Sequence, residues 1–171
     1  MAAGDELVDL VDADDNVLET VTRAEMRRID AWHRCVYVLV QDRAGRVLLQ
    51  QRSLDKDFAP GAWDIGAGGV VASGEDYDTA ARRELAEELG VYDAEMEPWG
   101  SARYDRDGLR LHGRVYRVVH DGPFSFDDGE VQRVEWVEAD SLIAEIAARP
   151  FVPDAPGIFL PILATLRTRT R

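Results

Sequence analysis

The segment 69–91, GVVASGEDYDTAARRELAEELGV, constrains the fold of this chain more than any other stretch. Asp76 is a good N-cap, because its side chain can accept hydrogen bonds from the free N–H groups of a first helical turn. Apolar residues follow at intervals of four, which places them in one stripe: Ala81, Leu85 and Leu89. Gly90 supplies a left-handed stop. We therefore predict a helix from about Asp76 to Leu89 that packs against a core.

The same helix carries three carboxylates on one face. Glu84, Glu87 and Glu88 lie at positions i, i+3 and i+4, where like charges repel by roughly 0.2–0.5 kcal/mol per pair in an isolated helix. Hard divalent cations prefer carboxylate oxygens and complete their shells with water and substrate phosphates. We therefore interpret this face as a site for Mg²⁺ or Mn²⁺. The alternative, a solvated acidic surface, is disfavoured by the glycines and the arginine at fixed spacings around the helix.

The whole segment fits the pattern G-x5-E-x7-R-E-U-x-E-E-x-G-U, in which U is a bulky aliphatic residue. Every defined position matches, namely Gly69, Glu75, Arg83, Glu84, Leu85, Glu87, Glu88, Gly90 and Val91. This is the signature box of the Nudix hydrolase superfamily, which the chain resembles. The resemblance implies an α/β fold of the α/β/α sandwich type with a central mixed sheet, and metal-dependent hydrolysis of a diphosphate linkage.

Two residues of the box have more than one interpretation. The resemblance makes Glu75 either an accessory metal ligand or a charge partner of Arg83, and Arg83 would orient the carboxylates. Gly69 belongs to the run 66–69, GAGG, which suits a strand only where the backbone closely approaches another group. That group is either substrate phosphate or the metal-binding helix.

Apolar and turn patterns outside the box predict a single domain over residues 1–171, opened by a hairpin over about 6–21. Further strands are expected over 35–41, 46–51, 109–120 and 131–137. Helices are expected over 139–149 and about 158–171, separated by a proline-rich connection over 150–157. Strands on both sides of a central helix favour a mixed sheet between helices, in agreement with the resemblance.

The composition narrows the classes of partner. The formal net charge is −13, so the chain is a poor candidate for sequence-independent binding to DNA or RNA, which requires a cationic surface. Substrate phosphates must then be recruited by bound metal and a local basic cluster. Cys35 is the one cysteine, which excludes an internal disulfide framework. The start lacks the pattern of a signal peptide, and no apolar run is long enough to span a bilayer, so we expect a cytoplasmic protein without a membrane partner.

Similarity beyond the box, over about 7–137, points to the Nudix branch related to isopentenyl-diphosphate isomerase. The residues that carry it are Thr22-Arg23, His33-Arg34, Gln51-Arg52, Lys56, Pro60-Gly61 and Trp63. An arginine and a lysine of that branch contact the diphosphate, which implies that Arg52 and Lys56 bind substrate phosphate. The alternative is ordinary surface charge beside Asp55 and Asp57.

The isomerase reaction itself is disfavoured. Its catalytic cysteine and a metal-binding histidine lie in a stretch that corresponds to WDIGAGGV at 63–70, where glycine and valine replace them. Cys35 lies in an apolar β run and is interpreted as core packing. His33 matches a second isomerase histidine, but because its partner is missing we expect a structural hydrogen bond rather than a metal bond.

The predicted reaction converts a nucleoside diphosphate-X to a nucleoside monophosphate and phosphoryl-X. The glutamates at 84, 87 and 88 hold metal, and Glu87 is the first choice of general base. Glu130, just before the last strand, is the second base or a further metal ligand, with a solvated loop acid as the alternative. The rivals are isoprenyl-diphosphate isomerisation and a non-catalytic nucleotide sensor, for which a broken box would be expected. A homodimer is common in the family, and no pattern in this chain argues for or against one.

Overall fold

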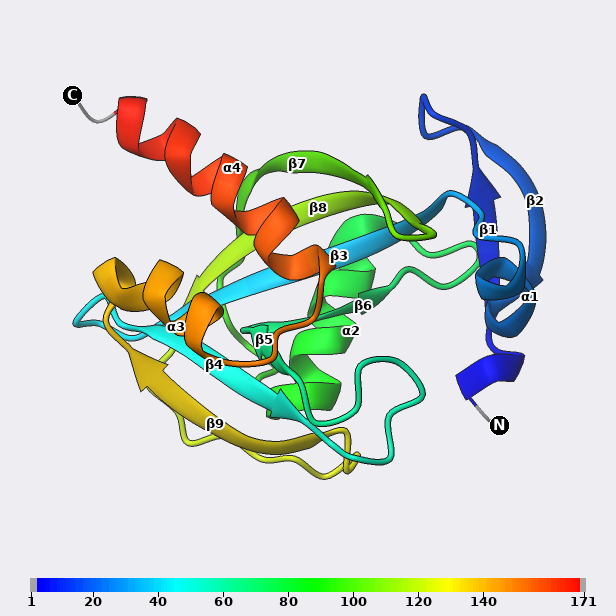
Figure 1. Cartoon of the computed structure of the whole chain (residues 1–171). Coiled ribbons are helices and arrows are strands. Elements are labelled where there is room, and N and C mark those ends of the chain that lie inside the picture. Colours follow the sequence, from blue (N-terminus) through cyan, green and yellow to red (C-terminus); the bar gives the residue numbers. More distant parts are fainter. Residues whose placement is uncertain (1–2, 170–171) are drawn as a thin grey trace.

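The computed structural model describes residues 3–169 and contains a seven-stranded mixed sheet packed between helices (Figure 1). Its strands are β3 (His33–Gln41), β4 (Val47–Arg52), β5 (Trp63–Ile65), β6 (Ala67–Val70), β7 (Glu97–Arg106), β8 (Leu109–Val119) and β9 (Val131–Val137). β3 pairs in parallel with β8, and the other pairings within the described residues are antiparallel. The predicted mixed sheet is confirmed.

Helices cover both faces of this sheet. They are α1 (Arg23–Arg28), α2 (Tyr77–Leu89), α3 (Leu142–Ala148) and α4 (Asp154–Arg169), with 3-10 turns at η1 (Ala3–Asp5) and η2 (Ala139–Ser141). α2 lies behind the sheet in Figure 1 and α4 crosses its front. Alternate side chains of β3 pack into the two apolar layers on either face of the sheet. Those that pack with α2 are Val36, Val38 and Val40, and those that pack with α4 are Cys35, Tyr37 and Leu39. Burial on both faces explains why this strand is an almost continuous apolar run, and it confirms the α/β/α sandwich.

The box helix has the predicted ends. The Asp76 side chain accepts a hydrogen bond of 2.7 Å from the N–H of Thr79, and Gly90 ends the helix with φ 67°. The predicted apolar stripe is buried in the layer between α2 and the sheet, at Ala81, Leu85 and Leu89. Both ends and the buried face of α2 are therefore fixed. Because of this, the carboxylates of Glu84, Glu87 and Glu88 have a defined direction relative to β6.

The N-terminal hairpin is formed by β1 (Leu7–Val11) and β2 (Val17–Thr22), as predicted. Val8 is fully buried and bridges to Ala72 in the loop that joins β6 to α2. α1 follows β2 directly, with Thr22 as its N-cap. The hairpin therefore carries α1 to the side of the sheet where the box begins (Figure 1).

Two local predictions were wrong. Two strands, β5 and β6, lie between β4 and the box helix, although only the run 66–69 was considered as a strand there; β5 pairs with β4. The C-terminal helix begins at Asp154 rather than near 158, so the second half of the expected connection is helical. Pro156 is tolerated in the first turn because its missing N–H would have no helical partner there. Residues 170–171 of the expected helix lie outside the described residues, and no helix within 3–169 has the length and apolar character needed to cross a bilayer.

Candidate active site

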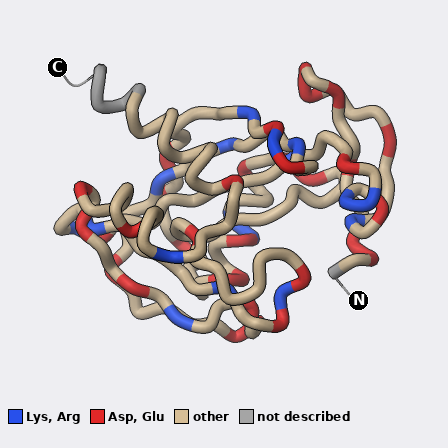
Figure 2. Tube along the Cα trace, viewed as in Figure 1, with Lys and Arg blue, Asp and Glu red and all other residues tan. Residues whose placement is uncertain are grey.

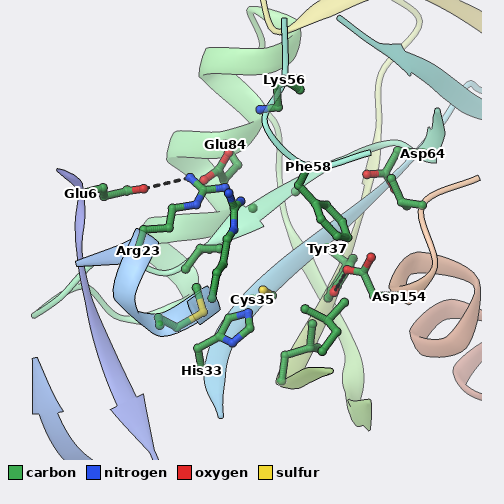
Figure 3. Close-up of a pocket in the computed structure, with 18 of the residues that line it drawn as sticks. Glu6, Arg23, His33, Cys35, Tyr37, Lys56, Phe58, Asp64, Glu84 and Asp154 are labelled. Carbon is green, nitrogen blue, oxygen red and sulfur yellow. Dashed lines mark hydrogen bonds and ion pairs between the residues drawn. The ribbon is translucent and has the colours of Figure 1, made fainter. Parts of the chain in front are cut away.

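A cavity of about 600 Å³ lies between α1, the loop after β4, β6 and α2 (Figure 3). Its lining includes seven of the nine predicted site residues, namely Arg52, Lys56, Gly69, Arg83, Glu84, Glu87 and Glu130. The other two, Glu75 and Glu88, lie behind this lining and contact it. A volume of this size is typical of a small-molecule site, so the fold brings the predicted residues to a place where a substrate can bind.

The carboxylate of Glu84 occupies the space that a side chain at position 69 would fill. A Cβ atom at Gly69 would lie 2.3 Å from Glu84 Oε1 and 2.7 Å from Oε2, so any side chain at this position would displace the carboxylate. Glu84 is 8% exposed and points toward β6 and the cavity. Of the two interpretations of this glycine, the structure shows the close approach of the box helix.

Glu88 lies deeper, beneath the strand. It is 2% exposed, and its Oε2 accepts hydrogen bonds from the N–H of Gly68 at 3.0 Å and from Gln50 Nε2 at 2.8 Å. Burial raises the pKa of Glu88, and it raises the pKa of Glu84 together with the charge of Glu88. Two carboxylates are thus held close together in a site where their ionised forms are poorly solvated.

Arg83 connects the acidic residues of the box. Its Nε and Nη2 atoms bind the two oxygens of Glu75, each at 3.0 Å, in a bidentate pair. Nη1 donates to Glu84 at 2.7 Å and to Glu87 at 3.1 Å, while Nη2 also reaches the carbonyl of Val70 at 3.2 Å. One guanidinium therefore fixes three carboxylates relative to β6. Glu75 is thus a charge partner of Arg83, and its role as a metal ligand stays a prediction.

The donor set fits a hard divalent cation. Glu87 has a side chain 51% exposed at the cavity, whereas Glu84 and Glu88 are buried carboxylates with raised pKa values. A divalent cation would add positive charge to that of Arg83 beside this pair. Within the described residues, no three acidic, histidine or cysteine side chains already converge as a metal cage. Arg83 instead lies among the carboxylates, so the side chains would have to rearrange around an ion.

A family model of the NUDIX domain matches residues 31–155. The chain belongs to the Nudix hydrolase family. A Nudix hydrolase of Yersinia pestis is 39% identical over 156 residues, which cover 90% of this chain and 84% of that protein. The crystal structure of a Deinococcus radiodurans protein has a TM-score of 0.78 at 31% identity and covers 87% of this chain and 94% of its own.

A more distant solved structure supports the fold alone. The NUDIX domain of NrtR from Shewanella oneidensis, in a cocrystal with ADP-ribose, has a TM-score of 0.61 at 21% identity. It covers 88% of this chain and 100% of that domain. The Nudix fold therefore extends over most of the described residues.

The two predicted phosphate-binding cations of this Nudix chain differ in their surroundings. Lys56 forms an ion pair with Glu130 and has a side chain 13% exposed. Arg52 is 7% exposed, donates to the carbonyl of Phe58 at 3.1 Å, and has Nη1 3.8 Å from Asp64 Oδ2. The alternative of ordinary surface charge is therefore wrong for both. Lys56 and Glu130 also form one unit, so neither is a freely solvated loop residue.

The tertiary structure adds cavity residues that were not predicted to have a role. Arg23 and Arg27 of α1 line the cavity, and Arg23 donates from Nη1 to Glu6 at 3.0 Å while its buried Nε has no partner. Figure 3 marks the contact between Arg23 and Glu6 with a dashed line. The only sequence signal for Arg23 was its presence in the motif shared with the isomerase branch, and its position depends on how the hairpin packs.

Cys35 and His33 have the structural roles that were expected. The Cys35 thiol is buried in the core, and burial raises its pKa well above the usual range, so it is a poor nucleophile. His33 shares a hydrogen bond of 3.0 Å between Nδ1 and the carbonyl of Ala31, and burial lowers its pKa to about 4. Isomerase chemistry at these residues is disfavoured by this Nudix structure.

Proposed function

We propose that this Nudix hydrolase cleaves a diphosphate linkage in a nucleoside diphosphate derivative or nucleotide, with Mg²⁺ or Mn²⁺ as cofactor. The observation that carries the proposal is that the Glu84 carboxylate lies against Gly69 at the wall of a cavity that Lys56 also lines. Carboxylates suited to metal thus face the same space as a cation suited to phosphate. This arrangement can hold a charged linkage and a nucleophilic water together.

The reaction would break one phosphoanhydride bond. The oxygen of a water molecule forms a bond to one phosphorus, the bond from that phosphorus to the bridging oxygen breaks, and the leaving phosphate keeps the electron pair. Bound divalent ions would neutralise charge on the phosphate oxygens and lower the pKa of water. Glu84 and Glu88 are the residues we assign to holding them, with Glu87 beside them.

Glu87 is our first choice for the group that takes the proton from water. Half of its side chain is exposed at the cavity, so water can reach it, and Arg83 holds its Oε2 at 3.1 Å. Glu130 is the second choice, because its carboxylate is already engaged in an ion pair with Lys56. Arg83 acts as a positioning residue for all three carboxylates it contacts.

Of the two predicted phosphate binders, Lys56 is the one we assign to the diphosphate. Its ammonium group is a point charge at the cavity, and substrate phosphate can replace Glu130 as its partner. Arg52 is turned toward the Phe58 carbonyl and Asp64, so it is our second choice for a contact with phosphate.

Charge favours small substrates over nucleic acid polymers. Figure 2 shows Asp and Glu spread along the hairpin, the loops and the sheet edges, among scattered basic residues, in a chain with net charge −13. We infer a small-molecule substrate on this basis. A cytoplasmic location and a homodimer also stay predictions, which cell fractionation and light scattering would test.

A substrate panel tests the function. Nucleoside di- and triphosphates, nucleotide sugars and ADP-ribose would be assayed for phosphate-bond cleavage with Mg²⁺, with Mn²⁺ and with chelator. We expect metal-dependent turnover, and we expect Glu87→Gln and Glu88→Gln each to lower kcat by at least roughly a hundredfold. Glu138→Gln, at an exposed position beyond β9, is the control and should retain wild-type turnover. Near-normal rates in both box variants would remove the proposed roles, and binding without cleavage would support a sensor.

A further inference from the structure

The side of the cavity away from Glu84 is formed by a second polar group, which we call the Asp64 end: Asp64, Asp154, Tyr37 and Arg52. Figure 3 shows Asp64 and Asp154 on that side, with Phe58 beside them. None of these residues belongs to the box. Hydrolysis as described above gives Asp64, Asp154 and Tyr37 no part.

Two carboxylate oxygens at this end lack a hydrogen-bond donor, the buried Oδ1 of Asp154 and the Oδ2 of Asp64 at the cavity. Asp64 Oδ1 accepts 2.7 Å from the N–H of Ile65, whereas Oδ2 has only Arg52 Nη1 at 3.8 Å, which is beyond hydrogen-bond range. Tyr37 donates to Asp154 and Arg52 donates to the Phe58 carbonyl, so neither satisfies Asp64 Oδ2. Among the described residues no other donor reaches it, and the side chain retains 12% exposure at the cavity.

The electrostatics of the Asp64 end are unbalanced. Burial raises the pKa of Asp64 to about 7 against the opposing charge of Arg52, and the carboxyl of Asp154 nearby adds to the rise. Asp64 is mostly buried and its Oδ2 has no donor, and such an acceptor costs free energy that a ligand can return by donating a hydrogen bond. We propose that Asp64 Oδ2 accepts a hydrogen bond from an amino group on the base of a nucleoside diphosphate substrate. This rests on the proposed function and names the class of base.

The rest of the lining favours a ring over a sugar or an isoprenyl chain. Apolar and aromatic side chains adjoin the Asp64 end, including Phe58, Cys35, Leu111 and Val152. A flat base with one polar edge matches such walls, whereas a sugar needs several polar partners. An isoprenyl chain has no donor, and it would strip water from Asp64 without replacing it.

Matched pairs of substrates test the proposal. ADP and inosine diphosphate differ in an amino or an oxo group on the base, and CDP and UDP differ in the same way. We expect the wild-type kcat/KM to favour an amino member over its oxo partner by roughly tenfold to a hundredfold. Equilibrium binding of α,β-methylene analogues of ADP and inosine diphosphate, measured by calorimetry without turnover, should show the same order.

Asp64→Asn gives the sharpest result. The Ile65 N–H should keep the amide oxygen at the position of Oδ1, which leaves the NH₂ group at the position of Oδ2. The acceptor thereby becomes a donor, and the preference should disappear or reverse toward the oxo base. Asp42→Asn is the matched control, a buried aspartate that binds Arg46 in the β3–β4 turn, and should keep the amino preference.

The outcomes separate this inference from the proposed function. If no diphosphate is cleaved with any metal, the hydrolase proposal fails, and the calorimetric pairs still decide on Asp64. Equal handling of both members of each pair by the wild-type protein would overturn the inference, whether or not Asp64→Asn folds. An amino preference that survives in a folded Asp64→Asn protein would overturn it as well.

Discussion

Gly69→Ala is the substitution for which the structure makes the most definite prediction. The backbone of Gly69 does not have a positive φ, so alanine brings no backbone strain. Its Cβ would nevertheless lie 2.3 Å from Oε1, 2.5 Å from Cδ and 2.7 Å from Oε2 of Glu84. All three near atoms belong to one carboxylate, so the carboxylate has to move.

The size of this movement sets the expected effect. An ordinary contact needs about 3.4 Å, so the Glu84 carboxylate must withdraw by about 1 Å. A misplacement of about 1 Å in a catalytic group can lower the rate by about a hundredfold, which corresponds to about 2.7 kcal/mol in the activation free energy. The 2.7 Å hydrogen bond from Arg83 to Glu84 would be weakened at the same time.

The assay is steady-state turnover of the best diphosphate substrate across a titration of Mg²⁺. We expect kcat to fall by about a hundredfold and the metal concentration for half-maximal rate to rise, while the unfolding midpoint drops by only a few degrees. Gly4→Ala is the control, since its added Cβ would meet only Ala24 at 3.6 Å. Wild-type kcat and metal dependence in a folded Gly69→Ala protein would refute the argument that Glu84 must approach this strand.

Three further predictions follow from contacts in and around the cavity. Arg83→Lys should lower kcat by roughly tenfold to a hundredfold with little change in KM, because an ammonium group cannot bind Glu75 bidentately and also reach Glu84 and Glu87. Kinetics unchanged from wild type would contradict the positioning role of Arg83. Without divalent metal, the free energy of unfolding should fall as the pH rises from about 4 to 7. The reason is that the buried carboxyls of Asp64, Glu84 and Glu88, with raised pKa values, keep the folded protein more protonated than the unfolded chain over that range. Urea unfolding at pH 5 and pH 8 measures this change, and a higher free energy of unfolding at pH 8 would disprove the prediction. Cys35→Ala should retain hydrolysis within roughly threefold, and the native thiol should resist alkylation at pH 8; loss of turnover without loss of stability would show that the thiol takes part in the reaction.

Local sequence patterns were sufficient where the physics is local. The caps of α2 depend on the side chain of Asp76 and the left-handed backbone of Gly90, which lie within a turn of the groups they satisfy. The apolar run over 35–41 predicted a strand for a similar reason, and the structure buries both faces of this strand, β3. The wrong start of α4 is also instructive, because Pro156 resembles a helix breaker in the sequence yet is acceptable in a first turn.

The sequence by itself determined that three glutamates share one helix and that a glycine-rich strand precedes them, since both facts follow from spacing along the chain. Only the tertiary structure decided that Glu84 and Glu88 are buried against β6 while Glu87 remains half exposed. It also decided that Arg23 and Asp64, remote in sequence, line the same cavity. The reason is that burial, desolvation and the approach of unlike elements depend on how the hairpin, sheet and helices pack, and such long-range packing is not encoded in any local periodicity.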